Sequence, residues 1–239
     1  MGTFRIAVLA SGTGTNLQAI LDGLHGRDGI EVVCVASNKP GARALERAAN
    51  AGVETGVFPR EDHGDRVERD AAMADWLTAR EVELIVLAGY MELLSAEFVR
   101  RFPNRIVNVH PALLPAFPGA HAVADALAWG ARVTGVTVHL VDEEVDHGPI
   151  VFQEAIPIHD GEGADSLAAR IHEIEHRLLP KAVRALTEGR VRVDGRRVTI
   201  AEPAADGEPA AVGEAAPVGE PVAVDESAAV GEPAAVAEP

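Results

Sequence analysis

The sequence of 239 residues contains one cysteine and no long hydrophobic run. Cys34 has no partner in the chain, which excludes an internal disulfide and suits a reducing cytosol. Its place in the apolar run at 32–36 predicts a small core residue. No stretch approaches the roughly 18 apolar residues of a membrane helix, and residues 1–5 lead into a predicted strand rather than a signal peptide. We therefore expect a soluble, cytoplasmic protein with no membrane partner.

Basic residues are scarce as well. The chain has 21 Lys and Arg against 37 Asp and Glu, which gives a formal net charge of −16. Residues 201–239 hold nine of the acidic side chains and no Lys, Arg or His. Because neither this segment nor the rest of the chain has a basic excess, we expect no nucleic-acid partner.

The last 39 residues also lack aromatic side chains and have a repetitive composition, with Gly-Glu-Pro-Ala-Ala-Val at 207–212 and again at 231–236. Such a segment buries too little apolar surface to offset the entropy lost on ordering. We expect a folded domain at 1–200 and a disordered acidic low-complexity tail at 201–239. The sequence leaves open whether the protein is a monomer or a homodimer.

Short apolar runs alternate with amphipathic segments along residues 1–200, a pattern that predicts an α/β fold with a doubly wound, mostly parallel sheet. We expect strand 150–158 to be antiparallel, and a small hairpin at 190–200 to turn at Asp194-Gly195. The predicted strands are 5–10, 31–36, 53–58, 83–89, 105–109, 133–140 and 150–158, and the predicted helices are 16–24, 42–50, 67–80, 95–101, 121–130 and 164–188.

A glycine-rich loop, Ser-Gly-Thr-Gly-Thr-Asn at 11–16, joins the first strand to the first helix. Its glycines allow close approach of a ligand, and Thr15 and Asn16 offer donors at a helix N-terminus, where a phosphate is favoured. The loop lacks the third glycine of a dinucleotide fingerprint and the Gly-Lys-Ser/Thr ending of a triphosphate loop. It fits a small monophosphate best, with a tight turn that binds nothing as the alternative.

Asn108 and His110 alternate with apolar residues at the end of the predicted fifth strand, so both side chains point from one face. An amide beside an imidazole, with a carboxylate to orient the ring, suits a reaction that develops an oxyanion and moves a proton. Asp146 is the candidate carboxylate. The alternative is that Asn108 caps a turn and His110 is a hydrogen-bonded residue at a strand end.

Several ordered motifs together resemble the 10-formyltetrahydrofolate-dependent formyltransferases, over residues 4–188. Within that family, the loop at 11–17 is similar to that of the phosphoribosylglycinamide formyltransferases of purine synthesis. The motifs are Asn108-x-His110-Pro-x-Leu-Leu-Pro115, Pro118-Gly119-x-His121, Gly135-Val-Thr-Val-His139 and Asp142-Glu-x-x-Asp146-x-Gly148-Pro-Ile.

The resemblance implies an enzyme with a formyltransferase-type Rossmann-like fold that moves a formyl group from 10-formyltetrahydrofolate to the amine of glycinamide ribonucleotide, without a metal. By resemblance, His110 is a cationic donor to the oxyanion and Asn108 a neutral donor. Asp146 keeps His110 protonated and helps a proton pass through water. No covalent intermediate is implied, and the peptide bond before Pro115 is expected to be cis.

The family's binding residues carry over to two groups of positions. On the acceptor side they are Gly14, Thr15 and Asn16 for the phosphate and Glu175 for the glycinamide or ribose end. On the folate side an arginine is expected near residue 60, for which we favour Arg60 over Arg66. The remaining folate positions are Met91, Glu92, Leu93, Leu94, Asn108, Asp142, Glu143, Glu144, Val145 and Asp146.

Three other functions remain as alternatives. One is a metal site formed by residues that lie near one another in sequence, although their spacing matches no compact zinc pattern. These residues are His110, His121, His139, Asp146 and His147.

A hydrolase that releases formate from the same folate would use a similar Asn, His and Asp. Such enzymes usually carry an N-terminal regulatory domain, whereas this chain starts at the first predicted strand. The third alternative is a ligand-binding module without catalysis, which would not need three polar side chains with separate roles to converge on one point.

Overall fold

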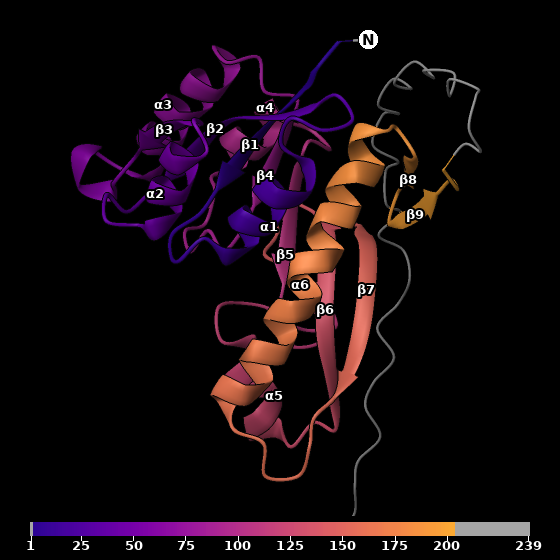
Figure 1. Ribbon diagram of the computed structural model, residues 1–239. Coiled ribbons are helices and arrows are strands. Elements are labelled where there is room, and N and C mark those ends of the chain that lie inside the picture. The colour runs from indigo at the N-terminus through magenta and orange to yellow at the C-terminus, as the bar shows by residue number, and fades with distance from the viewer. Residues whose placement is uncertain (1, 204–239) are drawn as a thin grey trace, which may run out of the picture.

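The computed structural model describes residues 2–203. They form a seven-stranded sheet with helices on both faces and a separate two-stranded hairpin (Figure 1). The order in the sheet is β3-β2-β1-β4-β5-β6-β7. The pairs from β3 to β5 are parallel, whereas β5, β6 and β7 pair antiparallel. The structure confirms the predicted doubly wound, mostly parallel α/β fold.

The elements follow the predicted order with small shifts at their ends. A short 3-10 helix, η1, was not predicted. None of the helices in residues 2–203 combines the length and hydropathy that crossing a membrane requires. The strands are β1 (Phe4–Leu9), β2 (Ile30–Ser37), β3 (Glu54–Val57), β4 (Leu84–Leu87), β5 (Ile106–His110), β6 (Val133–Leu140), β7 (Ile150–Pro157), β8 (Val191–Asp194) and β9 (Arg197–Ile200). The helices are α1 (Thr15–Leu24), α2 (Arg43–Asn50), η1 (Arg60–Asp62), α3 (Arg66–Thr78), α4 (Ala96–Arg101), α5 (Ala122–Trp129) and α6 (Ala164–Thr187).

Alternate residues of β1 fill two different cores. Ile6 and Val8 are buried in the core that includes residues of α1, α2 and α6, whereas Ala7 and Leu9 are buried in the core that includes residues of α3 and α4. The long helix α6 runs along one side of the molecule with α1 beside it (Figure 1). A strand that is covered on both faces needs apolar residues at every position, which explains the continuous apolar run in the sequence.

The antiparallel part of the sheet brings the polar residues of two mostly apolar strands together. The predicted antiparallel strand at 150–158 is confirmed as β7, and β6 is also antiparallel to its neighbour β5. In this register Asn108 pairs with His139, and His110 pairs with Thr137. The pairing therefore places His139 beside Asn108, a neighbour that the sequence pattern did not reveal.

The end of the described chain differs from prediction in two details. The hairpin turns at Gly195 and Arg196, because Asp194 already pairs with Arg197. Backbone pairing also continues to residue 201, whose N–H donates to the Arg190 carbonyl at 2.9 Å. Most of the predicted acidic tail, residues 204–239, lies outside the described residues.

Candidate active site

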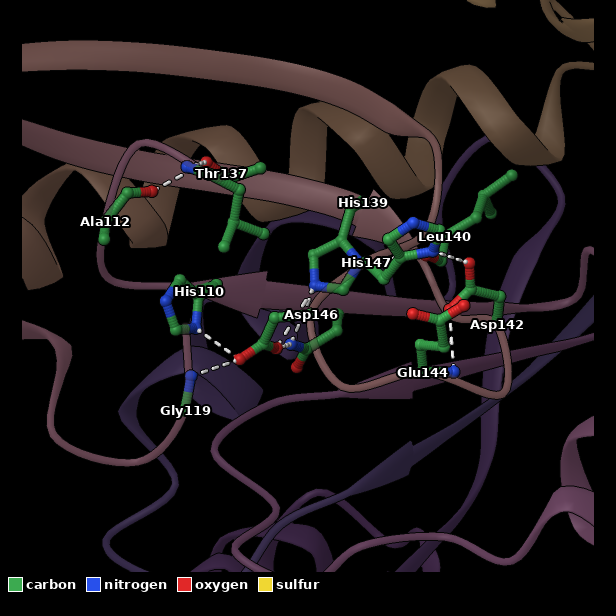
Figure 2. Close-up of polar contacts among 12 residues, drawn as sticks. His110, Ala112, Gly119, Thr137, His139, Leu140, Asp142, Glu144, Asp146 and His147 are labelled. Atoms are coloured by element: carbon green, nitrogen blue, oxygen red, sulfur yellow. Dashed lines mark hydrogen bonds and ion pairs between the residues drawn. The ribbon is translucent and has the colours of Figure 1, made fainter. Parts of the chain in front are cut away.

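Asn108 and His110 lie at the carboxyl end of β5, and the loop that follows them is fixed by hydrogen bonds from β6. The Thr137 hydroxyl donates to the Ala112 carbonyl at 2.6 Å and accepts from the Leu114 N–H at 3.0 Å (Figure 2). The peptide bond between Leu114 and Pro115 is cis, which confirms the prediction. The loop therefore leaves the strand in a defined direction beside His110.

Asp146 lies between the two predicted oxyanion donors. Its Oδ2 accepts from the Gly119 N–H at 2.7 Å and lies 3.4 Å from His110 Nδ1. Its Oδ1 accepts from Asn108 Nδ2 at 3.5 Å and lies 3.6 Å from His139 Nε2. Figure 2 shows the side chains of His110, His139 and Asp146 pointing toward one another. The predicted convergence of Asn108, His110 and Asp146 is thus present, and His139 joins it.

His139 has a defined tautomer because both ring nitrogens have neighbours. Its Nδ1 lies 2.9 Å from the Leu140 carbonyl, which can only accept, so we place the proton there. Nε2 lies 3.1 Å from Asn108 Nδ2, and in the neutral ring it accepts from that amide. The sequence analysis considered His139 only as a metal ligand. In the structure its hydrogen bond orients the Asn108 side chain.

His110 is also held by the loop after β5. Its Nε2 lies 2.8 Å from the Phe117 carbonyl, so this nitrogen carries a proton and Nδ1 faces Asp146. Burial lowers the pKa of His110 and has a larger effect than the Phe117 carbonyl and the Asp146 carboxylate, which raise it. We expected Asp146 to keep this ring protonated. Burial outweighs it, and the pKa of His110 lies below its ordinary value.

Asp146 itself is kept ionised. Burial raises the pKa of its carboxyl group, but the nearby His139 ring, the hydrogen bond from the Gly119 N–H and the charge of His110 together hold it below its ordinary value. An ionised carboxylate that faces a neutral imidazole can accept a proton and pass it on. The pair therefore has the protonation states that a proton shuttle needs.

Two adjoining cavities contain most of the predicted folate residues. The central cavity, of about 420 Å³, is lined by Asn108, His110, Asp146 and the segment 89–93. A second cavity, of about 130 Å³, shares Asn108 and Asp146 with it. The second cavity is lined by Leu87, Tyr90, Glu92, Leu93, Leu94, Val99, Asn108, His139, Val141, Asp142, Glu143, Glu144, Val145 and Asp146. Every predicted folate residue except Arg60 lines at least one of the two.

The residues that follow β6 form the outer wall of the second cavity and are tied to the rest of the chain by arginines. Glu143 accepts from Arg100 at 2.9 Å. His147 lies 2.8 Å from Asp142 and accepts through its carbonyl from Arg196 at 2.6 Å. The hairpin β8–β9 therefore supports the loop that carries Asp146, which was not foreseen from the sequence.

The glycine-rich loop lines a third cavity, of about 260 Å³, which shares Gly89 and Met91 with the central one. Gly14 precedes α1 in the left-handed conformation, and a Cβ there would lie 2.7 Å from Ala44 Cα. The start of α1 has no side-chain cap. Its first N–H groups therefore remain available to an anion.

Asn16 lines this third cavity and joins it to Glu175 on α6. Asn16 Nδ2 donates to Glu175 Oε2 at 2.9 Å, although the two residues are far apart in sequence. Asn16 Oδ1 is buried and has no hydrogen-bond partner among residues 2–203. Burial raises the pKa of Glu175 despite this hydrogen bond. Glu175 thus takes one of the two N–H groups of the Asn16 amide, and the predicted contact of Asn16 with the phosphate stays a prediction.

Arg60, the predicted folate arginine, belongs to the segment after the edge strand β3. It begins η1 after β3, and β2, β1 and β4 separate that edge strand from β5. Neither Arg60 nor the alternative, Arg66, is among the residues that line the two folate cavities. The arginine of this region that approaches the cavity wall is Arg69, whose Nη2 donates to the Leu93 carbonyl at 3.2 Å.

The other histidines of the possible metal site do not join the group. His121 precedes α5 as its N-cap residue, and His147 faces Asp142 at the surface. Within the described residues 2–203, no group of three or more His, Cys, Asp or Glu side chains is arranged to hold a metal ion.

Comparison with known proteins identifies the family. Residues 4–183 match the formyl transferase family. A phosphoribosylglycinamide formyltransferase from Mycobacterium tuberculosis is 45% identical over 85% of this chain and 94% of the relative. The trifunctional purine biosynthetic protein adenosine-3 of Gallus gallus is 45% identical over 79% of this chain, but the match spans only 19% of that longer protein.

A solved structure agrees with the sequence matches. The crystal structure of glycinamide ribonucleotide transformylase 1 from Symbiobacterium toebii has a TM-score of 0.81 and 47% identity, and the match covers 84% of this chain and 95% of that one. The fold, the family match over residues 4–183 and the sequence identity to relatives matched over most of their length all indicate the same family. The chain therefore belongs to the formyl transferase family, in its phosphoribosylglycinamide formyltransferase branch.

Proposed function

We propose that this protein transfers the formyl group of 10-formyltetrahydrofolate to the amine of glycinamide ribonucleotide in de novo purine biosynthesis. One observation carries the proposal: the cavity of the glycine-rich loop adjoins the cavity that holds Asn108, His110 and Asp146, with Gly89 and Met91 common to both. A phosphorylated amine and a formyl donor can therefore meet at these three side chains. The names of the full-length relatives agree with this chemistry.

The oxyanion of the tetrahedral adduct would be stabilised by Asn108 and His110. One N–H of Asn108 is used by His139 at 3.1 Å, and the other makes only a long contact with Asp146 at 3.5 Å. Because a contact of 3.5 Å is a weak hydrogen bond, this second N–H can donate to a formyl oxygen instead with little loss of hydrogen-bond energy. Negative charge on this oxygen adds to that of Asp146 and raises the pKa of His110 during the reaction. Nδ1 would then take up a proton from water, donate it to the oxyanion as a hydrogen bond, and release it when the carbonyl re-forms.

Proton transfer would complete the reaction. The amine nitrogen attacks the formyl carbon, a C–N bond forms, and the carbonyl electron pair moves to oxygen. The adduct nitrogen then loses its proton to the Asp146 carboxylate, directly or through water, and N10 of the folate receives a proton. The bond between the formyl carbon and N10 breaks as the carbonyl re-forms. The products are the formylated amine and tetrahydrofolate, and no covalent bond to the protein is needed.

The acceptor would bind between α1 and α6. The uncapped N–H groups at the start of α1 suit the phosphate, since they carry the positive end of the helix dipole. Asn16 Oδ1 and the Glu175 carboxylate offer buried acceptors for hydroxyl or amine groups of the ribose and glycinamide. We therefore assign Glu175 to the glycinamide or ribose end, and Asn16 to the acceptor through its backbone N–H, its Oδ1 and the amide N–H that does not face Glu175.

A coupled assay tests this proposal. Purified protein mixed with 10-formyltetrahydrofolate should produce tetrahydrofolate only when glycinamide ribonucleotide is added. A phosphate-free glycinamide riboside at the same concentration should react far more slowly. Equal rates with the two acceptors would remove the assigned role of the glycine-rich loop.

Replacing Thr15 and Asn16 together with alanine should weaken binding of the phosphorylated acceptor by roughly 1 to 3 kcal/mol, because charge-assisted hydrogen bonds are lost and Glu175 loses its donor. KM for the acceptor should rise accordingly, while KM for the folate stays near that of the wild type. Asp22→Ala, at an exposed position of α1, is the control. A rise in folate KM of equal size would contradict the assignment.

A further inference from the structure

The segment 89–95 forms a wall that all three cavities share. It joins β4 to α4 without helix or strand structure. Tyr90, Glu92 and Leu93 line both the central and the second cavity. Met91 lines the central cavity and the third cavity, which we call the acceptor cavity because it contains the glycine-rich loop. The side chains of Met91 and Leu93 are 64% and 55% exposed, so they do not anchor the segment by packing. Tyr90 and Leu94 pack against the core, and polar contacts hold the residues beside them.

Two of these contacts come from the loops after β1 and β2. The Met91 N–H donates to the Ser11 hydroxyl at 2.7 Å, and that hydroxyl donates to Asn38 at 2.6 Å. Asn38 Nδ2 in turn donates to Glu92 at 3.3 Å. The first half of the segment is therefore linked to the loop that lines the acceptor cavity.

The other contacts come from Arg69 and Asp70 on α3. Arg69 Nη1 lies 3.1 Å from Glu92 Oε2, and Nη2 donates to the Leu93 carbonyl at 3.2 Å. Asp70 accepts from Arg69 at 2.7 Å through Oδ1 and from the Ser95 N–H at 2.6 Å through Oδ2. One buried ion pair thus holds three of the four residues that follow Met91.

Arg69 is fully buried and is not among the lining residues of any of the three cavities. A buried guanidinium is tolerated only where nearby groups compensate its charge and its N–H groups. Here Asp70 and the Leu93 carbonyl accept hydrogen bonds from it, and the Glu92 carboxylate is a counter-ion at 3.1 Å. Any effect of Arg69 on a substrate must therefore pass through the segment that it holds. Glu92 differs in this respect, because it lines the folate cavities and can also touch the ligand directly.

We propose that Arg69 is a positioning residue: with Asp70 it holds residues 92–95 in the conformation that admits the formyl folate, and so it sets folate affinity rather than the rate of formyl transfer. This inference rests on the proposed function. The segment has no regular structure of its own, so removal of the guanidinium frees Glu92 and the Leu93 carbonyl together. The polar groups around the amine and the formyl carbon remain in place.

The test compares Arg69→Met and Arg69→Lys with Arg101→Met. Arg101 is the control because it forms an ion pair between α4 and α3, at 2.8 Å from Asp75, and lines none of the three cavities. Arg69→Met should raise KM for 10-formyltetrahydrofolate about tenfold and change kcat and acceptor KM by less than about threefold. Arg101→Met should leave all three constants near the wild-type values.

Arg69→Lys keeps the buried charge, so it should fold even where Arg69→Met does not. A single ammonium cannot reach Asp70, Glu92 and the Leu93 carbonyl in the same geometry, and we expect a rise in folate KM of about threefold. Amide hydrogen exchange at residues 91–93 should be faster in both variants, and this measurement needs no substrate. Normal exchange and folate KM in a folded variant would overturn the inference, as would a loss confined to kcat. A wild-type protein without activity would instead contradict the proposed function.

Discussion

Replacing His110 with alanine is expected to lower kcat by about 10²-fold to 10³-fold, with little change in either KM. The variant loses Nδ1, which faces Asp146 and becomes a cationic donor during the proposed reaction, while the cavity walls that bind the two substrates remain. A donor that acts on the developing oxyanion stabilises the transition state more than the bound substrates, so the loss appears in kcat. Steady-state kinetics with both substrates varied will measure it.

Asn108→Ala should give a loss of similar size for the same reason, and it also leaves His139 Nε2 without its donor. His159→Ala is the control, because this exposed histidine follows β7 and lies in none of the three cavities. If either active-site variant retained the wild-type kcat and only raised KM, its side chain would bind substrate without stabilising the oxyanion.

Replacing Asp146 with asparagine should reduce kcat by about 10²-fold near neutral pH and move the pH optimum downward. The carboxylate raises the pKa of His110 against the larger effect of burial. Without it, burial lowers that pKa further. The cationic fraction of a histidine falls as pH rises through its pKa, so a lower pKa moves this fall to lower pH.

The measurement is kcat against pH for the wild type and for Asp146→Asn. The variant should lose activity at a lower pH than the wild type on the limb where rate falls with rising pH. An unchanged profile with a lower plateau would mean that Asp146 carries protons or positions groups without setting the charge of His110.

Much of the site could be predicted because its residues lie close to one another in sequence or belong to specific motifs. Asn108 and His110 share a strand face, and the glycines of the loop before α1 indicate an anion site. The alternation of apolar runs and amphipathic segments was sufficient for the parallel part of the sheet. These are local patterns, and local patterns are what a sequence displays directly.

The contacts that were missed join residues far apart along the chain. His139 reaches Asn108 only because β6 is antiparallel to β5, and Asn16 meets Glu175 across α1 and α6. Arg69 lies within an amphipathic helix, where its burial depends on the segment after β4. The lowered pKa of His110 is a further example, since burial in the folded protein decides it. Such features follow from packing, which motif spacing does not encode.

The fate of the formyl carbon tests the central claim most directly. Purified protein should be incubated with 10-formyltetrahydrofolate labelled in the formyl group, with and without glycinamide ribonucleotide. The account predicts that the label appears in the formylated amine, in equal amount to the tetrahydrofolate formed, and that almost none is released when the acceptor is omitted. Release of labelled formate at the same rate without the acceptor would identify a hydrolase and contradict the account.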